Sequence, residues 1–107
     1  MKKQISKELA RIIHRLVARY HPETIILFGS LASKSPGRWS DIDLALVKKT
    51  KRRFLDRLKD ALLIASPKEA LDIVVYTPEE VTSMESHGNP FWIHEIKEKG
   101  RILYQRS

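Results

Sequence analysis

Apolar residues recur along the first half of the chain with the spacing of amphipathic helices. Residues 4–18 place an apolar side chain every three or four positions between basic residues, and Pro22 follows, where a helix cannot continue. Residues 54–65 repeat this spacing and stop before Pro67. The pattern predicts two helices whose apolar stripes face the core.

Short runs rich in Ile, Val and Leu alternate with these helices. Residues 25–28, 41–47 and 70–76 are too short for buried helices and have the β-branched composition of strands. The run at 70–76 is almost continuously apolar, which predicts burial on both faces or a central place in a sheet. Residues 102–104 predict a short edge strand near the end of the sequence.

Two more helices are predicted between these last strands. Thr77-Pro78-Glu79-Glu80 has an N-cap threonine, a proline in the first helical position and a glutamate three residues after the cap. A second helix is expected from Phe91 to Lys99, where Gly100 ends it. Its apolar residues cover more than one face, so this surface either fills a corner of the core or meets a partner chain.

Length and composition indicate one globular domain over residues 1–107. Hydrophobic residues make up 42% and charged residues 31%, as in ordinary globular proteins. The absence of cysteine excludes disulfides, thiolate zinc sites and a cysteine nucleophile. Neither a membrane-spanning apolar run nor a signal peptide is recognised, so we expect a cytoplasmic protein without membrane contact.

The chain is strongly basic, with a formal net charge of +7 and a pI near 9.9. Such a surface favours nucleotide phosphates, RNA or an acidic protein face as partners, and general solubility is the alternative explanation. Residues 48–53 carry five of the basic side chains in one run. The first interpretation of this run is a solvated turn before a helix, and the second is a contact patch for nucleic acid or an acidic protein.

The chemistry-bearing residues are a glycine–serine pair and three acids at the ends of predicted strands. Gly29-Ser30 follows the first apolar run, where glycine lets the backbone approach a ligand and a helix start would present N–H donors to an anion. Asp41 and Asp43 lie on one face of a strand because they are two residues apart. If the strand that contains Asp72 lies alongside, three carboxylates converge near Gly29-Ser30 and favour a hard cation such as Mg²⁺.

This arrangement resembles the nucleotidyltransferase superfamily, and in particular its minimal single-domain members, the MNT group. The shared pattern is Gly-Ser, ten residues, Asp-x-Asp and a later Asp, which here are Gly29-Ser30, residues 31–40, Asp41-Ile42-Asp43 and Asp72. The similarity extends from about Leu16 to Tyr104.

The loop after the glycine–serine pair departs from the family pattern. Many members read Gly-Ser-Arg-Ala-Arg-Gly, whereas this chain continues Leu31-Ala32-Ser33-Lys34 and lacks both arginines. Lys34 and Arg38 are the candidate replacements for contacts to the nucleotide. Trp39 in the same loop is a candidate either for stacking on a base or for covering the edge of the core.

The resemblance implies the α/β nucleotidyltransferase fold, a small mixed sheet of three to four strands flanked by about four helices. It also implies that Asp41, Asp43 and Asp72 are the catalytic residues and hold two Mg²⁺ ions, while Gly29 and Ser30 bind the phosphates of ATP. An acceptor hydroxyl then attacks the α-phosphorus, so that AMP is transferred and pyrophosphate leaves.

The resemblance further implies a small helical partner of the HEPN type, a toxin that the protein would modify as its antitoxin. Two alternatives stay open. A catalytically weak or inactive protein-binding antitoxin is favoured by the missing arginines and disfavoured by the three retained carboxylates, which are costly to bury unpaired. A basic RNA-binding protein rests only on the net charge and the 48–53 run.

Overall fold

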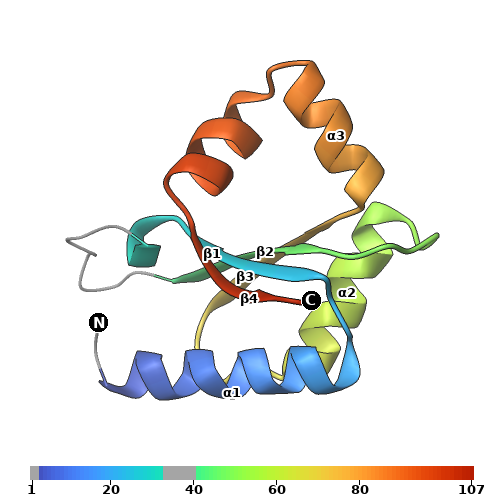
Figure 1. The fold of residues 1–107 in the computed structure, drawn as a ribbon. Helices are drawn as coiled ribbons and strands as arrows, with labels where there is room; N and C mark the ends of the chain where they lie inside the picture. Colours follow the sequence, from blue (N-terminus) through green and yellow to red (C-terminus); the bar gives the residue numbers. More distant parts are fainter. Residues whose placement is uncertain (1–2, 33–40) are drawn as a thin grey trace.

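A computed structural model describes residues 3–32 and 41–107, and in it a β-sheet is covered by helices on both faces (Figure 1). Lys34, Arg38 and Trp39 lie outside the described residues. The sheet order is β3-β2-β1-β4, where β1 pairs antiparallel with β2 and β4, and β2 pairs parallel with β3. The strands are β1 (Thr24–Phe28), β2 (Ile42–Val47), β3 (Leu71–Tyr76) and β4 (Arg101–Gln105).

The helices form two pairs. Figure 1 shows α1 (Lys3–Arg19) and α2 (Phe54–Ala65) on one side of the sheet, and α3 (Pro78–Ser86) with the π-helix η2 (Phe91–Glu98) rising from the other. A short 3₁₀ turn, η1 (Ser30–Ala32), follows β1. The predicted α/β class with a small mixed sheet is confirmed, as are the expected helices; that residues 91–98 form a π-helix was not predicted.

Alternate residues of the strands divide the core into two layers. On the face covered by α1 and α2, Ile42, Leu44 and Leu46 of β2 are fully buried. On the face covered by α3 and η2, Ala45 packs with Ile26, Trp92 and Ile96. Because side chains alternate along a strand, Asp43 stands on the second face, opposite Ile42 and Leu44.

The third strand lies at an edge of the sheet, beside β2 only. Its apolar run reflects the first predicted alternative, contact on both faces. Ile73 and Val75 are buried against the α1–α2 layer, while Val74 and Tyr76 pack partly buried against the α3–η2 layer. A parallel edge strand covered on both sides needs this composition.

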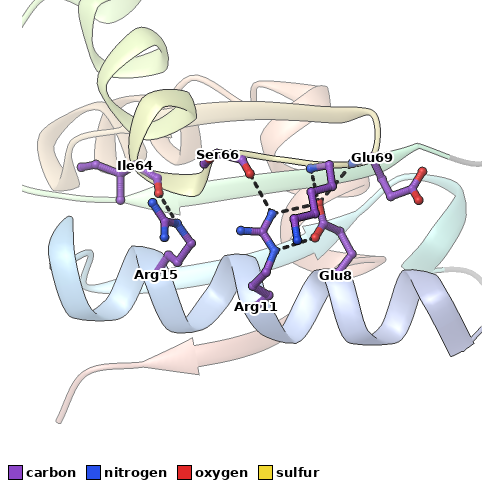
Figure 2. A network of polar contacts seen from close by, with 7 residues as sticks. Glu8, Arg11, Arg15, Ile64, Ser66 and Glu69 are labelled. Atoms are coloured by element: carbon purple, nitrogen blue, oxygen red, sulfur yellow. Dashed lines mark hydrogen bonds and ion pairs between the residues drawn. The ribbon is translucent and has the colours of Figure 1, made fainter.

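A polar network ties α1 to the connection between α2 and β3 (Figure 2). Glu8 is buried, and its Oε2 atom accepts hydrogen bonds from the backbone N–H groups of Lys68 at 2.5 Å and Glu69 at 3.1 Å. The Arg11 guanidinium donates to Glu8 Oε1 at 2.8 Å and to the Ser66 carbonyl at 2.7 Å. This connection leads directly into β3, so the network helps to fix where that strand begins.

The two helices on the opposite face begin at side-chain caps. The predicted capping box is confirmed: Thr77 Oγ1 accepts from the Glu80 N–H at 3.1 Å, and Glu80 Oε1 accepts from the Thr77 N–H at 2.8 Å. Asn89 Oδ1 accepts from the Trp92 N–H at 3.1 Å at the start of η2. No helix in residues 3–32 and 41–107 is long and apolar enough to cross a membrane.

The basic run at 48–53 forms the connection between β2 and α2. Lys48 Nζ donates to the Tyr20 carbonyl at 2.5 Å, and Arg52 Nε donates to Asp60 Oδ2 at 2.9 Å. Both side chains contact other parts of the fold, Arg52 while 57% exposed, and the run precedes α2 as the first interpretation predicts. The contact-patch interpretation stays a prediction.

Candidate active site

Asp43 and Asp72 are brought together by the parallel pairing of β2 and β3. They are direct partners in the register of these strands, and their side chains are close enough for a hydrogen bond between them. The predicted neighbourhood of the two strands is confirmed. Asp43 is half-buried and Asp72 is exposed, so the pair lies where the sheet face opens to solvent.

The Asp43 carboxylate has a perturbed pKa. Burial, together with the carboxylates of Asp72 and Asp41, raises the pKa of Asp43 to about 6. Among the described residues, no Lys or Arg side chain forms an ion pair with any of these three acids. Adjacent carboxylates of this kind favour either a shared proton or a bound cation, and oxygen donors suit a hard cation such as Mg²⁺.

Asp41 lies immediately before β2, exposed, and on the same side of the chain as Asp43 by alternation. Its charge contributes to the raised pKa of Asp43. However, residues 3–32 and 41–107 contain no group of three or more His, Cys, Asp or Glu side chains placed to hold a metal ion. The predicted convergence of three carboxylates is thus observed as a close pair, Asp43 and Asp72, with Asp41 near enough to act through its charge.

Gly29 lies against the Asp43 carboxylate. Its φ of +73° is in the left-handed region, and a Cβ atom at this position would overlap Asp43 Oδ2. The sequence predicts a glycine at which the backbone approaches a ligand closely; in the structure it approaches the Asp43 side chain. The glycine therefore leaves room for the carboxylate on the neighbouring strand.

Ser30 follows as the first residue of η1 and is exposed. The predicted helix start is short, a single turn of three residues in which the Ala32 N–H donates to the Gly29 carbonyl at 3.1 Å. Gly29 and Ser30 are nevertheless at the end of β1 that adjoins the carboxylates, because Phe28 pairs with Asp43. Lys34 and Arg38, the other candidates for nucleotide binding, lie outside the described residues.

Two aromatic rings beside the carboxylates were not among the predicted site residues. Phe28 stands next to Asp43 on the same face, since directly paired residues of antiparallel strands share a face. Phe91 packs against Phe28 with ring centroids 5.6 Å apart and planes at 89°. The alternation in residues 25–28 indicates the orientation of Phe28, but its contact with Phe91 depends on how η2 returns to the sheet.

A pocket of about 610 Å³ opens at the other end of the same face. Thr24, Val47 and Trp92 are among its lining residues, and Thr24 pairs with Val47 at the opposite end of the β1–β2 ladder from Asp43. Gly29, Ser30, Asp41, Asp43 and Asp72, the predicted site residues within the described ranges, do not line it. The carboxylate end of the sheet is therefore the candidate active site.

The chain matches one known family over most of its length. A family model described as "Polymerase beta, Nucleotidyltransferase" matches residues 10–107, a range that contains Gly29, Asp41, Asp43 and Asp72. No curated protein matches the chain.

Proposed function

This chain belongs to the polymerase beta nucleotidyltransferase family, and we propose that it transfers AMP from ATP to an acceptor hydroxyl in a Mg²⁺-dependent reaction that releases pyrophosphate. Family membership supports a nucleotidyltransferase of the general kind. The identity of the nucleotide, of the metal and of the acceptor goes beyond family membership and is what we propose. The observation that carries it is the juxtaposition of Asp43 and Asp72 in paired strands beside the Gly29 turn.

Each residue at this end of the sheet has a chemical role in the proposal. Asp41, Asp43 and Asp72 would hold two Mg²⁺ ions, which when bound neutralise charge on the attacking and leaving oxygens. Gly29 and Ser30 would donate hydrogen bonds from N–H and hydroxyl groups to the triphosphate. The exposed Asp72 would accept the proton of the acceptor hydroxyl while the hydroxyl oxygen forms its bond to the α-phosphorus. The bond from that phosphorus to the bridging oxygen then breaks, and pyrophosphate leaves.

For the acceptor, we propose a tyrosine of a HEPN-type helical protein, so that the chain acts as an antitoxin by modifying its toxin partner. The resemblance to minimal single-domain members supports this choice. The net charge of +7 is also favourable, since it would attract an acidic partner surface as well as ATP.

The test is transfer of label from α-³²P-ATP with Mg²⁺ into a lysate of the source organism, with the products separated into protein and RNA. Wild type is compared with Asp43→Asn and with the control Asp60→Asn, an acid on α2 that pairs with Arg52. We expect a labelled protein band with wild type and Asp60→Asn but not with Asp43→Asn.

Three other outcomes would contradict parts of the proposal. Label in RNA would replace the protein acceptor by a nucleic acid. Equal labelling by Asp43→Asn would remove the carboxylate pair from the mechanism. Absence of label, with MgATP still bound, would favour a non-catalytic binding module, the alternative that fits the lack of a three-carboxylate group among the described residues.

A further inference from the structure

We propose that Phe91, supported by Phe28, is the surface on which the nucleobase of the substrate stacks. This assignment rests on the proposed function, because the triphosphate must lie at Asp43 and Asp72 for the base to fall beside them. It adds a base-binding element on η2 to a site whose other residues lie on β2 and β3 or directly beside β1 and β2.

The position of Phe91 follows from two contacts. Phe28 is the direct neighbour of Asp43 across the β1–β2 ladder, on the same face of the sheet. Phe91 contacts Phe28 on the side where α3 and η2 cover the sheet. Phe28 thus lies between Phe91 and the Asp43 position. In a nucleotide the ribose separates the base from the phosphates, so a base beside the carboxylates, rather than on them, is the expected arrangement.

Part of the Phe91 ring is exposed to solvent. The perpendicular contact with Phe28 occupies only part of the ring, and 45% of the Phe91 side chain remains exposed. An exposed phenylalanine contributes little to the core, and single exposed apolar residues are common in proteins. Its place near the Asp43 and Asp72 carboxylates is what gives this one a specific use, since every base has a π-face that stacks on an aromatic ring.

The backbone at Phe91 is held firmly enough to present the ring in one place. Asn89 caps the start of η2 through the Trp92 N–H, and the neighbouring Trp92 is buried with its Nε1 donating to Glu85 Oε2 at 3.1 Å. A ring fixed before binding loses less entropy when a ligand stacks on it. The π-helical form of η2 also supports a binding role for this segment, because π-helical segments are rare and occur frequently at functional sites.

Phe54 provides a matched control within the same chain. It is exposed to a similar degree, 39%, and it also packs against an aromatic ring, that of Tyr76 at 6.1 Å. Tyr76 pairs with Val47 at the far end of β2 from Asp43. Phe54 is therefore similar to Phe91 in exposure and environment but lies away from the carboxylates.

The experiment compares two ligands by calorimetry in the presence of Mg²⁺: α,β-methylene-ATP, which cannot be cleaved at the α-phosphorus, and inorganic tripolyphosphate, which has no base. The proteins are wild type, Phe91→Leu, Phe91→Trp and Phe54→Leu. We expect Phe91→Leu to lower the affinity for the nucleotide about tenfold, the effect of losing one stacking contact, and to leave the affinity for tripolyphosphate unchanged. Phe91→Trp should bind the nucleotide as well as wild type, and Phe54→Leu should change neither affinity.

The results that overturn the assignment are distinct from those that overturn the proposed function. Unchanged nucleotide binding by Phe91→Leu, or an equal loss for Phe54→Leu, would exclude stacking on Phe91. Parallel loss of both ligands in Phe91→Leu would indicate a structural role instead. A wild-type protein that binds tripolyphosphate but not the nucleotide would exclude a base site, whereas one that binds neither would remove the proposed function and this inference together.

Discussion

Gly29 and Asp43 are fitted to each other across the β1–β2 ladder. A Cβ atom on Gly29 would overlap Asp43 Oδ2 and lie 3.1 Å from Asp43 Cγ, and the φ of +73° at Gly29 favours glycine in any case. The turn after β1 and the carboxylate on β2 therefore depend on the same missing side chain. Any residue other than glycine must displace one of them.

Gly29→Ala tests this dependence. We expect a loss of about 1–2 kcal/mol in the free energy of unfolding from the left-handed backbone alone, with a further loss from the contact with Asp43. Transfer activity should fall by about a hundredfold, because a displacement of about 1 Å at a catalytic group has effects of that size. Urea denaturation and the label-transfer assay measure the two quantities.

Gly88 is the matched control for Gly29. Its φ is +69°, and nothing lies within 4 Å of a Cβ atom placed there. Gly88→Ala should show the backbone cost of about 1–2 kcal/mol and full activity. Similar stability and similar activity in the two variants would mean that the contact between Gly29 and Asp43 has no consequence.

The proximity of Asp43 to Asp72 predicts an effect of Mg²⁺ on stability. In EDTA at neutral pH, Asp43→Asn should be more stable than wild type by about 1 kcal/mol, or roughly 4–8 °C in Tm, because it removes repulsion between the two carboxylates. Adding Mg²⁺ should raise the Tm of wild type and leave that of Asp43→Asn nearly unchanged. Thermal scans with and without the metal check both; a variant that responds to Mg²⁺ as wild type does would show that the metal binds elsewhere.

The strands that carry Asp43 and Asp72 could be predicted because they depend on local patterns. Alternation along β2 sets the face of Asp43, and the apolar run after Asp72 indicates a strand covered on both sides. A sheet of few strands then offers few positions at which the Asp72 strand can pair. The register that pairs Asp43 with Asp72 was not predicted: the neighbourhood of their strands was a condition, and the family resemblance supplied Asp72 as the third acid.

The contacts of Gly29 and Phe91 could not be predicted in the same way. Both depend on how distant segments meet: a turn after β1 against a side chain of β2, and the first residue of η2 against the last of β1. The apolar pattern of residues 91–98 predicted a helix but not its winding, and in the structure Trp92 and Ile96 of this π-helix are buried against the sheet.

Arg57 links α2 to β3 and α3 from an almost fully buried position. Its Nη1 atom donates to Glu80 Oε1 at 2.8 Å and to the Val75 carbonyl at 3.2 Å. Arg57→Ala leaves both acceptors without this donor, so we expect the free energy of unfolding to fall by about 2–4 kcal/mol. Urea denaturation measures the change.

Arg53→Ala is the comparison, because Arg53 also pairs with an acid, Asp56 at 3.2 Å, but its side chain is 90% exposed. Its effect should stay within about 0.5 kcal/mol. If the two arginine variants lost equal stability, the buried contacts of Arg57 would not be what joins these elements.

The network around Glu8 predicts how stability depends on pH. The hydrogen bond from Arg11, joined by those from the Lys68 and Glu69 N–H groups and opposed by burial, lowers the pKa of Glu8 from 4.5 to about 2. Because the folded pKa lies below the unfolded value, the ionised carboxylate stabilises the fold above about pH 4.5, and this contribution is lost as the pH falls toward 2.

Glu8→Gln should therefore unfold more easily than wild type at pH 7, by about 2 kcal/mol, since hydrogen bonds to charged groups are worth about 1.5–3 kcal/mol each. The difference between the two proteins should shrink as the pH falls below 4.5 and vanish near 2, the range set by the two pKa values. Glu95→Gln, which removes an exposed pair with Lys99 at 3.2 Å, should differ from wild type by less than about 0.5 kcal/mol at every pH. Denaturation from pH 2 to 7 distinguishes two causes: a constant difference for Glu8→Gln would assign its effect to packing, and only a difference that grows with pH would assign it to the ionised Glu8 carboxylate.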